Sequence, residues 1–245
     1  MSARVDILGI GFDRLDLTAV ADRVLSRYQA GQRTFVITAN PEFVMLARRE
    51  PDLARLAKDA DLVVPDGTGV LIASRLLGDP LPARVPGRLL VPAVLGRLAS
   101  RGGSVFLLGA RPGVAERAGE ALRRRFPELE VAGAYAGSSS ADEDERIRSR
   151  IGAAAPRVLL VAYGMPAQER WLARNLAKLD TVRVAIGVGG VFDQLAGRVR
   201  VPPALVHAVG LEWLWRLFFE PRRWRRQRVL PVFVALVLRE RILRR

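Results

Sequence analysis

A carboxylate and two glycines directly follow a short apolar segment in the stretch DLVVPDGTG, residues 61–69. Glycine has no Cβ and accepts positive φ, so Gly67 and Gly69 would leave room beside Asp66 for a ligand to approach. In that arrangement Asp66 could serve as a general base, or as a ligand to a ribose or a metal ion. The residue types equally allow a second interpretation, in which Asp66 starts a turn or caps a helix that begins near Thr68.

Two further polar groups lie at the end of the apolar segment TFVITA, residues 34–39. Thr38 and Asn40 are two positions apart and therefore lie on the same side of an extended chain. Because neither is a strong acid or base, we expect them to hydrogen-bond a neutral, polyhydroxylated ligand. The alternative is a local Asn-Pro turn in which Asn40 caps a helix.

A third polar pair begins a helix in AYGMPAQERW, residues 162–171, just after Gly164. The side chain of Gln168 can present both a donor and an acceptor to a sugar or a base. For Glu169 we expect a simpler role, in which its charge complements the positive end of the helix dipole.

Two glycine-rich segments follow other apolar runs. FLLGARPGVAERA predicts a strand-to-helix turn from Gly109 to Gly113 whose amides could hold a phosphate. It is neither a Walker loop nor GxGxxG. GVGGVFD, residues 187–193, brings Asp193 into the same group, but we expect a loop rather than a helix after its glycines, which disfavours a dinucleotide fold there.

The elements that must position these residues follow from the apolar periodicity. Most of the segments are continuously apolar, as in strands covered by helices on both faces, and the intervening stretches are long enough for crossover helices. One such helix should run from the cap Asp16 to Gly31. We therefore predict an α/β fold with a Rossmann-like, open, mostly parallel sheet, in which the polar residues meet at the carboxyl ends of the strands. The predicted strands span residues 5–12, 34–39, 61–66, 104–110, 129–137, 157–164 and 182–190.

The length and composition bound the class of protein. A chain of 245 residues allows one main domain, which we place at residues 1–203, with a helical appendage at residues 204–245. There is no cysteine and one histidine, His207, for which we expect a structural role, so a metal site would have to be built from carboxylates. Charged residues near the first methionine interrupt any signal-peptide pattern, and we expect a cytoplasmic protein.

The positive charge is concentrated in the appendage. The net charge is +14, and residues 211–245 contain ten arginines against three glutamates. The apolar run at residues 229–238 is half the length of about 20 residues that a spanning helix needs. Together with nearby tryptophans and arginines it is typical of an anchor that lies on a membrane surface. A helix packed on the main domain and an oligomer interface are the alternatives, and nucleic-acid binding is disfavoured by the aromatic and apolar residues.

Six motifs in register resemble the WecG/TagA/CpsF glycosyltransferases, and the resemblance covers nearly the whole chain. The motifs are TANPE at 38–42, PDGTGV at 65–70, LLGARPGV at 107–114, GMPAQE at 164–169, FD at 192–193, and GLEWLWRL with EPRR at 210–223. Such membership implies an inverting, metal-independent transfer of N-acetylmannosamine, or its uronic acid, from a UDP donor. The implied acceptor is a sugar on a polyprenyl diphosphate, used in cell-envelope polymers such as teichoic acids.

The resemblance also assigns roles to individual residues. It implies that Asp66 is the general base, that Thr38 is a catalytic-site threonine and that Gln168 lines the pocket. It further implies that Arg84, Arg222 and Arg225 lie near phosphates. No cofactor beyond the UDP-sugar is implied, and the family admits homo-oligomers and peripheral attachment to the inner face of the cell membrane.

The sequence departs from the family pattern in a few places. Leu89 stands where an aspartate is usual, Gln227 where an aromatic residue often follows the arginines, and the segment at 202–210 lacks a common tryptophan. These changes bear on the acceptor and the sugar more than on the reaction. The alternative to a transferase is a non-catalytic, Rossmann-like nucleotide-binding protein whose basic tail binds a membrane or a partner.

Overall fold

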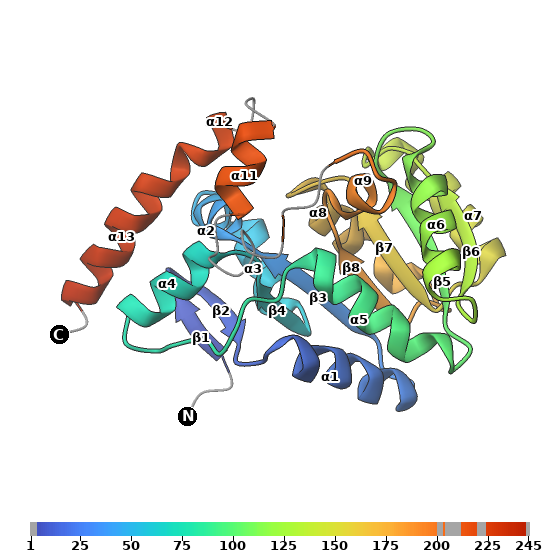
Figure 1. Ribbon diagram of the computed structural model, residues 1–245, viewed down its shortest axis with the longest axis horizontal. Helices are drawn as coiled ribbons and strands as arrows, with labels where there is room; N and C mark the ends of the chain where they lie inside the picture. The colour runs from blue at the N-terminus through green and yellow to red at the C-terminus, as the bar shows by residue number, and fades with distance from the viewer. Residues whose placement is uncertain (1–3, 200–202, 204–211, 220–223, 244–245) are drawn as a thin grey trace.

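The computed structural model describes residues 4–199, 203, 212–219 and 224–243 and is built around one large sheet (Figure 1). The sheet has six strands, all parallel, in the order β4-β3-β8-β7-β5-β6. This confirms the predicted α/β, Rossmann-like class. The strands are β3 (Thr34–Ala39), β4 (Leu62–Pro65), β5 (Ser104–Gly109), β6 (Glu130–Tyr135), β7 (Val158–Ala162) and β8 (Val184–Gly187).

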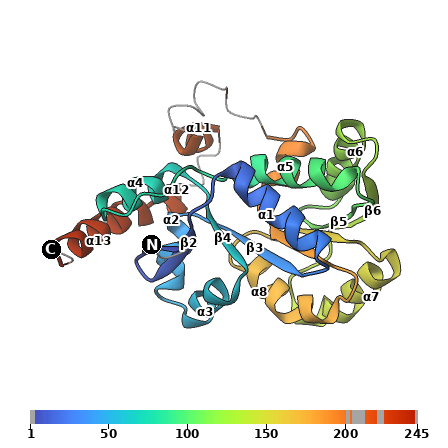
Figure 2. The same cartoon turned by 90° about the horizontal axis from the view of Figure 1, so that it is seen from below.

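Helices cover both faces of the sheet, as continuously apolar strands require. In β5, for example, Val105 and Leu107 join the core on one face, while Phe106 and Leu108 join the core on the other. Figure 2 shows the two helical layers with the sheet between them. One layer contains α1 (Leu17–Gln29), α5 (Gly87–Ala99) and α6 (Val114–Arg125), and the other contains α7 (Asp144–Ala154) and α8 (Ala167–Asn175).

The first apolar segment does not enter the large sheet, so the prediction of a single strand at residues 5–12 is wrong. It forms an antiparallel hairpin of β1 (Arg4–Ile7) and β2 (Ile10–Asp13). The turn between them has positive φ at both Leu8 (55°) and Gly9 (90°), as tight hairpin turns require. Asp13 Oδ2 accepts a hydrogen bond of 2.8 Å from the Val63 amide, so the hairpin covers the outer edge of β4.

The remaining helices gather around the carboxyl ends of the strands or flank the sheet. They are α2 (Pro41–Ala47), α3 (Pro51–Asp59), α4 (Thr68–Leu76), α9 (Val191–Leu195), α11 (Glu212–Phe219), α12 (Trp224–Gln227) and α13 (Val229–Leu243), with short 3₁₀ helices at Ala141–Glu143 and Leu176–Lys178. The helix predicted after Asp16 is confirmed as α1. The Asp16 side chain caps it by accepting a hydrogen bond of 2.8 Å from the Ala19 amide.

The helix α13 packs on the main body of the protein across α2 and α4 (Figure 1). Phe233 and Val237, one helical turn apart, are buried in the same core as the hairpin and helices α2 to α4. Val232, Val234 and Leu238 of the same helix are about half exposed. Among the described helices none is both long and apolar enough to cross a bilayer.

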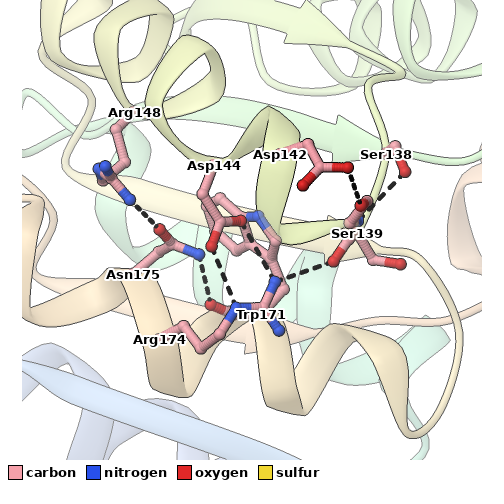
Figure 3. A network of polar contacts seen from close by, with 9 residues as sticks. Ser138, Ser139, Asp142, Asp144, Arg148, Trp171, Arg174 and Asn175 are labelled. Carbon is pink, nitrogen blue, oxygen red and sulfur yellow. Dashed lines mark hydrogen bonds and ion pairs between the residues drawn. The ribbon is translucent and has the colours of Figure 1, made fainter.

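A network of polar contacts fixes α8 against α7 and the loop that precedes it (Figure 3). The Arg174 guanidinium contacts both carboxylate oxygens of Asp144, at 3.0 and 3.2 Å, and donates to the Ser139 carbonyl at 2.8 Å. Arg148 donates to Asn175 at 2.7 Å. Burial alone would raise the pKa of Asp144, but the bonds from Arg174 and Asn175 outweigh it and hold that pKa below its usual range. The network therefore anchors the helix whose first turn carries Gln168.

Candidate active site

The polar residues singled out in the sequence come from the ends of four neighbouring strands. β4, β3, β8 and β7 are adjacent in the sheet, and the chain following each of them contributes to one edge. The Asp66 amide donates to the Ala39 carbonyl at 2.8 Å, which extends the pairing of β3 and β4 by one residue. Asp66 is thereby held immediately beside Asn40, and both side chains are half-buried.

A cavity of about 300 Å³, here called the polar cavity, opens over these strand ends. Six of the predicted site residues line it: Thr38, Asn40, Asp66, Gly164, Gln168 and Asp193. Its wall also includes Arg88, from the first turn of α5, and Gln194 from α9, neither of which was predicted from the sequence. A cavity lined by amides, carboxylates, a hydroxyl and a guanidinium suits a polar ligand with several hydrogen-bonding groups.

A second cavity of about 280 Å³, here called the apolar cavity, lies between the end of β4, helix α4 and helix α13. Its walls are mainly the aliphatic and aromatic side chains of Ile72, Leu76, Leu230, Phe233, Val234 and Val237. Gly67 and Arg84, both predicted site residues, lie at its polar end. A tail helix packed on the main domain was one alternative from the sequence, but the apolar residues of the tail are not restricted to one helical face and did not indicate which of them would line a cavity.

The two cavities share Asn40, Asp66 and Pro86. Asp66 is the only carboxylate among these shared residues, so a single acid group faces both spaces. The N-cap position of α4 belongs to Gly67, and Asp66 lies one residue before it. This arrangement places the predicted general base where two ligands, one in each cavity, would meet.

Thr38 and Gln168 are held in the polar cavity by the backbone of β8 and the turn after it. Thr38 Oγ1 donates to the Gly187 carbonyl at 3.2 Å, and Gln168 Oε1 accepts from the Gly189 amide at 2.9 Å. A Cβ on Gly187 would come within 2.7 Å of Gln168 Nε2, so only glycine allows this approach. The backbone around Gly187 therefore fixes the orientation of the Gln168 amide.

Glu169 lies in the first turn of α8, where its charge was expected to complement the helix dipole, but its side chain is buried. Its side chain is 1% exposed, and Oε1 accepts a hydrogen bond of 2.8 Å from Gln168 Nε2. Burial raises the pKa of Glu169 to about 7, because a charged carboxylate is poorly solvated there. Glu169 is thus a buried partner of Gln168, and together with Gly189 it satisfies both ends of that amide.

Gly67, Gly69 and the helix cap Asn40 lie near Asp66, and each is required by a different feature of the backbone. Gly67 has φ of 123° and open space around its Cα, in keeping with the predicted close approach of a ligand. Gly69 differs, because a Cβ there would lie 2.7 Å from Pro41 Cγ. The missing side chain allows this close packing, and Gly69 also lines the apolar cavity. The expectation that it leaves room for a ligand stays a prediction. Asn40 caps α2, since Oδ1 accepts from the Phe43 amide at 2.9 Å, and it also lines both cavities.

The turn after β5 contributes to the site only indirectly. Gly109 lines neither cavity; it has φ of 102°, and a Cβ there would lie 2.8 Å from the Ala162 backbone, so strand packing explains the glycine. Arg111 from the same turn lies 3.8 Å from Asp193 Oδ1, and Arg198 lies 3.6 Å from the same atom. Asp193 sits in α9, a five-residue helix, so the prediction of a loop after the glycines at 187–190 is wrong.

The remaining predicted residues fall in different places. Arg84 reaches Thr68 Oγ1 at 3.4 Å and lines the apolar cavity rather than the polar one. Leu89, in the first turn of α5, lines neither cavity. Arg222 and His207 lie outside the described residues, and Arg225 belongs to α12 without a described side chain. Within the described ranges, no group of three or more His, Cys, Asp or Glu side chains is placed to hold a metal ion.

Comparison with known proteins places this site in a family. Residues 5–245 match the Glycosyl transferase WecG/TagA/CpsF family. The chain belongs to this family. It is therefore a glycosyltransferase, which supports an enzyme over a non-catalytic nucleotide-binding protein and confirms the resemblance seen in the sequence motifs.

Two curated relatives share one enzyme name. A protein of Bacillus spizizenii is 34% identical over 225 residues, covering 91% of this chain and 86% of the relative. A protein of Staphylococcus aureus strain MRSA252 is 32% identical over 235 residues, covering 95% and 91%. Both are named N-acetylglucosaminyldiphosphoundecaprenol N-acetyl-beta-D-mannosaminyltransferase.

Proposed function

We propose that this glycosyltransferase moves an N-acetylmannosamine-type sugar from a UDP donor to an N-acetylglucosamine carried on a polyprenyl diphosphate. The donor would occupy the polar cavity, where Thr38, Gln168 and Asp193 offer hydrogen bonds to hydroxyl groups. The acceptor would reach Asp66 from the apolar cavity. The observation that carries the proposal is the position of Asp66 as the one carboxylate shared by the two cavities.

In the proposed reaction, Asp66 removes the proton of the attacking acceptor hydroxyl. The hydroxyl oxygen forms a bond to the anomeric carbon while the bond from that carbon to the UDP oxygen breaks, and the electron pair leaves with UDP. Attack from the side opposite the leaving group inverts the anomeric centre. General-base assistance of this kind contributes typically 10²–10⁴-fold to a rate.

The departing diphosphate needs a cation, and the structure changes which arginine is suited to that role. Arg84, which the resemblance places near phosphates together with Arg222 and Arg225, lines the apolar cavity, whereas Arg88 lines the polar one. We therefore assign the donor diphosphate to Arg88, whose guanidinium can contact two phosphate oxygens at once. The proposed mechanism uses no metal ion.

The tail has a second proposed role, which is to attach the enzyme to the inner face of the cell membrane. About half of the surface of Val232, Val234 and Leu238 is exposed on α13, and Phe218 of α11 is 79% exposed. Apolar side chains next to many arginines bind an anionic bilayer surface. Homo-oligomers, in which this surface would be covered, are part of the same proposal.

The test of the proposed reaction is substitution of Asp66. Purified Asp66→Asn should lose at least about 10²-fold in kcat for transfer to a polyprenyl-diphosphate N-acetylglucosamine, because the base is lost. Binding of UDP, measured by calorimetry, should stay close to that of the unchanged chain. Exposed Asp142→Asn in the distant 3₁₀ helix is the matched control. Retention of full turnover by Asp66→Asn would refute the role of Asp66.

A further inference from the structure

The chemistry of the apolar cavity points to a ligand that the sugar-transfer site alone does not need. Seven aliphatic and aromatic side chains from α4 and α13 line it, together with the polar residues Asn40, Glu42, Asp66, Thr68, Arg84 and Gln227. Among these polar residues, Arg84 reaches Thr68, which is two positions from Asp66. A sugar donor or a free sugar acceptor would bury few apolar atoms in such a space. Cavities of this size and composition bind apolar groups whose polar end reaches a few fixed polar residues.

Resting on the proposed function, we infer that the apolar cavity binds the isoprene units nearest the diphosphate of the lipid-linked acceptor, with Arg84 beside that diphosphate. The lining residues include a group suited to each part of this ligand. The acceptor hydroxyl belongs at Asp66, the diphosphate at Arg84, and the hydrocarbon against Phe233 and Val237, which are 2% and 1% exposed.

The rim of the cavity shows where the rest of the lipid would leave. Ile72 of α4 is 49% exposed and Val234 of α13 is 47% exposed, and both line the cavity. Beyond them, Val232 and Leu238 extend the apolar surface along α13 at 48% and 44% exposure. The rest of the hydrocarbon would leave past this apolar rim.

In this arrangement the enzyme recognises the lipid as well as the sugar. Burial of each CH₂ group strengthens binding roughly fourfold, so even one isoprene unit inside the cavity would dominate recognition of the acceptor. Acceptors with the same sugar diphosphate but different hydrocarbon should then differ in KM, because the sugar and diphosphate contacts are unchanged between them.

The test compares two water-soluble acceptors, farnesyl-diphosphate and ethyl-diphosphate N-acetylglucosamine, in the absence of vesicles. The unchanged chain should show a kcat/KM at least about tenfold higher for the farnesyl compound. Val234→Trp, which adds bulk at the rim, should reduce that ratio at least about fivefold. Ile242→Trp is the matched control, since it adds the same bulk at an exposed residue of the same helix that does not line the cavity. It should keep the ratio of the unchanged chain.

A direct measurement of acceptor binding tests this inference independently of the proposed reaction. The affinities of both compounds are measured by calorimetry without a donor, so that a chain with no transferase activity still gives an answer. Equal affinities for the farnesyl and ethyl compounds, or equal ratios for the two tryptophan variants, would overturn the inference. Tighter farnesyl binding without any transfer would overturn the proposed function and leave the inference standing. If Val234→Trp does not fold, Ile72→Trp is used in its place, because it narrows the rim of the same cavity from α4.

Discussion

The two cavities that meet at Asp66 are built in different ways. The polar cavity is formed within residues 38–199 by strand ends and the turns that follow them, and its glutamine is held by hydrogen bonds from both sides. The apolar cavity exists only because α13, far along the chain, packs on α2 and α4. Specific hydrogen bonds thus define the polar cavity, whereas burial of apolar side chains defines the other. Variants in each region test separately the hydrogen bonds of the polar cavity and the apolar packing of the other cavity.

The largest effect is expected where α13 enters the core. Phe233→Ala should lower the free energy of unfolding by about 3–5 kcal/mol, since a fully buried phenyl group is removed. Val232→Ala, one residue away and 48% exposed, should change it by less than about 0.5 kcal/mol. Denaturant unfolding monitored by circular dichroism measures both. Similar stabilities of the two variants would show that α13 does not anchor the apolar cavity.

On the polar side, Glu169→Gln tests the buried carboxyl. Folding raises the pKa of Glu169 from 4.5 to about 7, so the folded protein holds this proton more tightly than the unfolded chain. The resulting stability is fully present below pH 4.5 and is lost as the pH rises through about 7. Glutamine cannot ionise, and the variant should therefore gain up to about 3 kcal/mol relative to the unchanged chain between pH 4.5 and pH 8.

Thermal unfolding at several pH values checks this prediction. The control is Glu116→Gln, which removes a glutamate from the first turn of α6 at an exposed position. Its stability relative to the unchanged chain should not follow the same pH course. Parallel curves for Glu169→Gln and the unchanged chain would contradict the burial of an ionisable group beside Gln168.

Two arginines distinguish the cavities by their ligands. Arg88→Ala should raise the KM for the UDP-sugar about 30-fold, and Arg84→Ala should raise the KM for the lipid-linked acceptor by a similar factor. These factors correspond to about 2 kcal/mol for a hydrogen bond to a charged group. Initial rates with each substrate varied in turn provide the measurement. If both variants affected the same substrate, the division between the cavities would be wrong.

The smallest effects are expected for Gly67 and Gly69, the two glycines that follow Asp66. Gly69→Ala should destabilise the fold by about 1–2 kcal/mol, because the new methyl group meets Pro41. Gly67→Ala places alanine at φ 123° and ψ 154°, a region nearly confined to glycine, at a cost of about 1–3 kcal/mol, and its methyl group points into open space. We expect both variants to lose stability, and turnover to fall more for Gly67→Ala. Paired melting and rate measurements distinguish the two.

The large sheet was predictable from the sequence because its strands are continuously apolar and are punctuated by glycine. The meeting of Thr38, Asn40, Asp66 and Gln168 was predictable as well, since the ends of parallel strands share one edge. The hairpin was missed for a local reason. Leu8 adopts a positive φ that its residue type does not indicate, so the turn was hidden inside an apolar run.

Other features depend on contacts that no local pattern encodes. Glu169 in a first helical turn looks like many exposed glutamates, and only the packing of α8 against β8 buries it. In α13 the apolar residues surround the helix, so the sequence could not indicate that Phe233 and Val237 would be the buried pair. Arg84 and Arg88 are only four positions apart in sequence, yet they line different cavities.

The dependence of the apolar cavity on α13 has a consequence for the synthesis of the protein. Domains fold as the chain emerges from the ribosome, and residues 38–199 can form the polar cavity before α13 has been made. A nascent chain would then be able to hold a nucleotide sugar but not a lipid carrier. With the proposed assignment of the two cavities, the capacity to bind the lipid carrier would arise only when α13 docks.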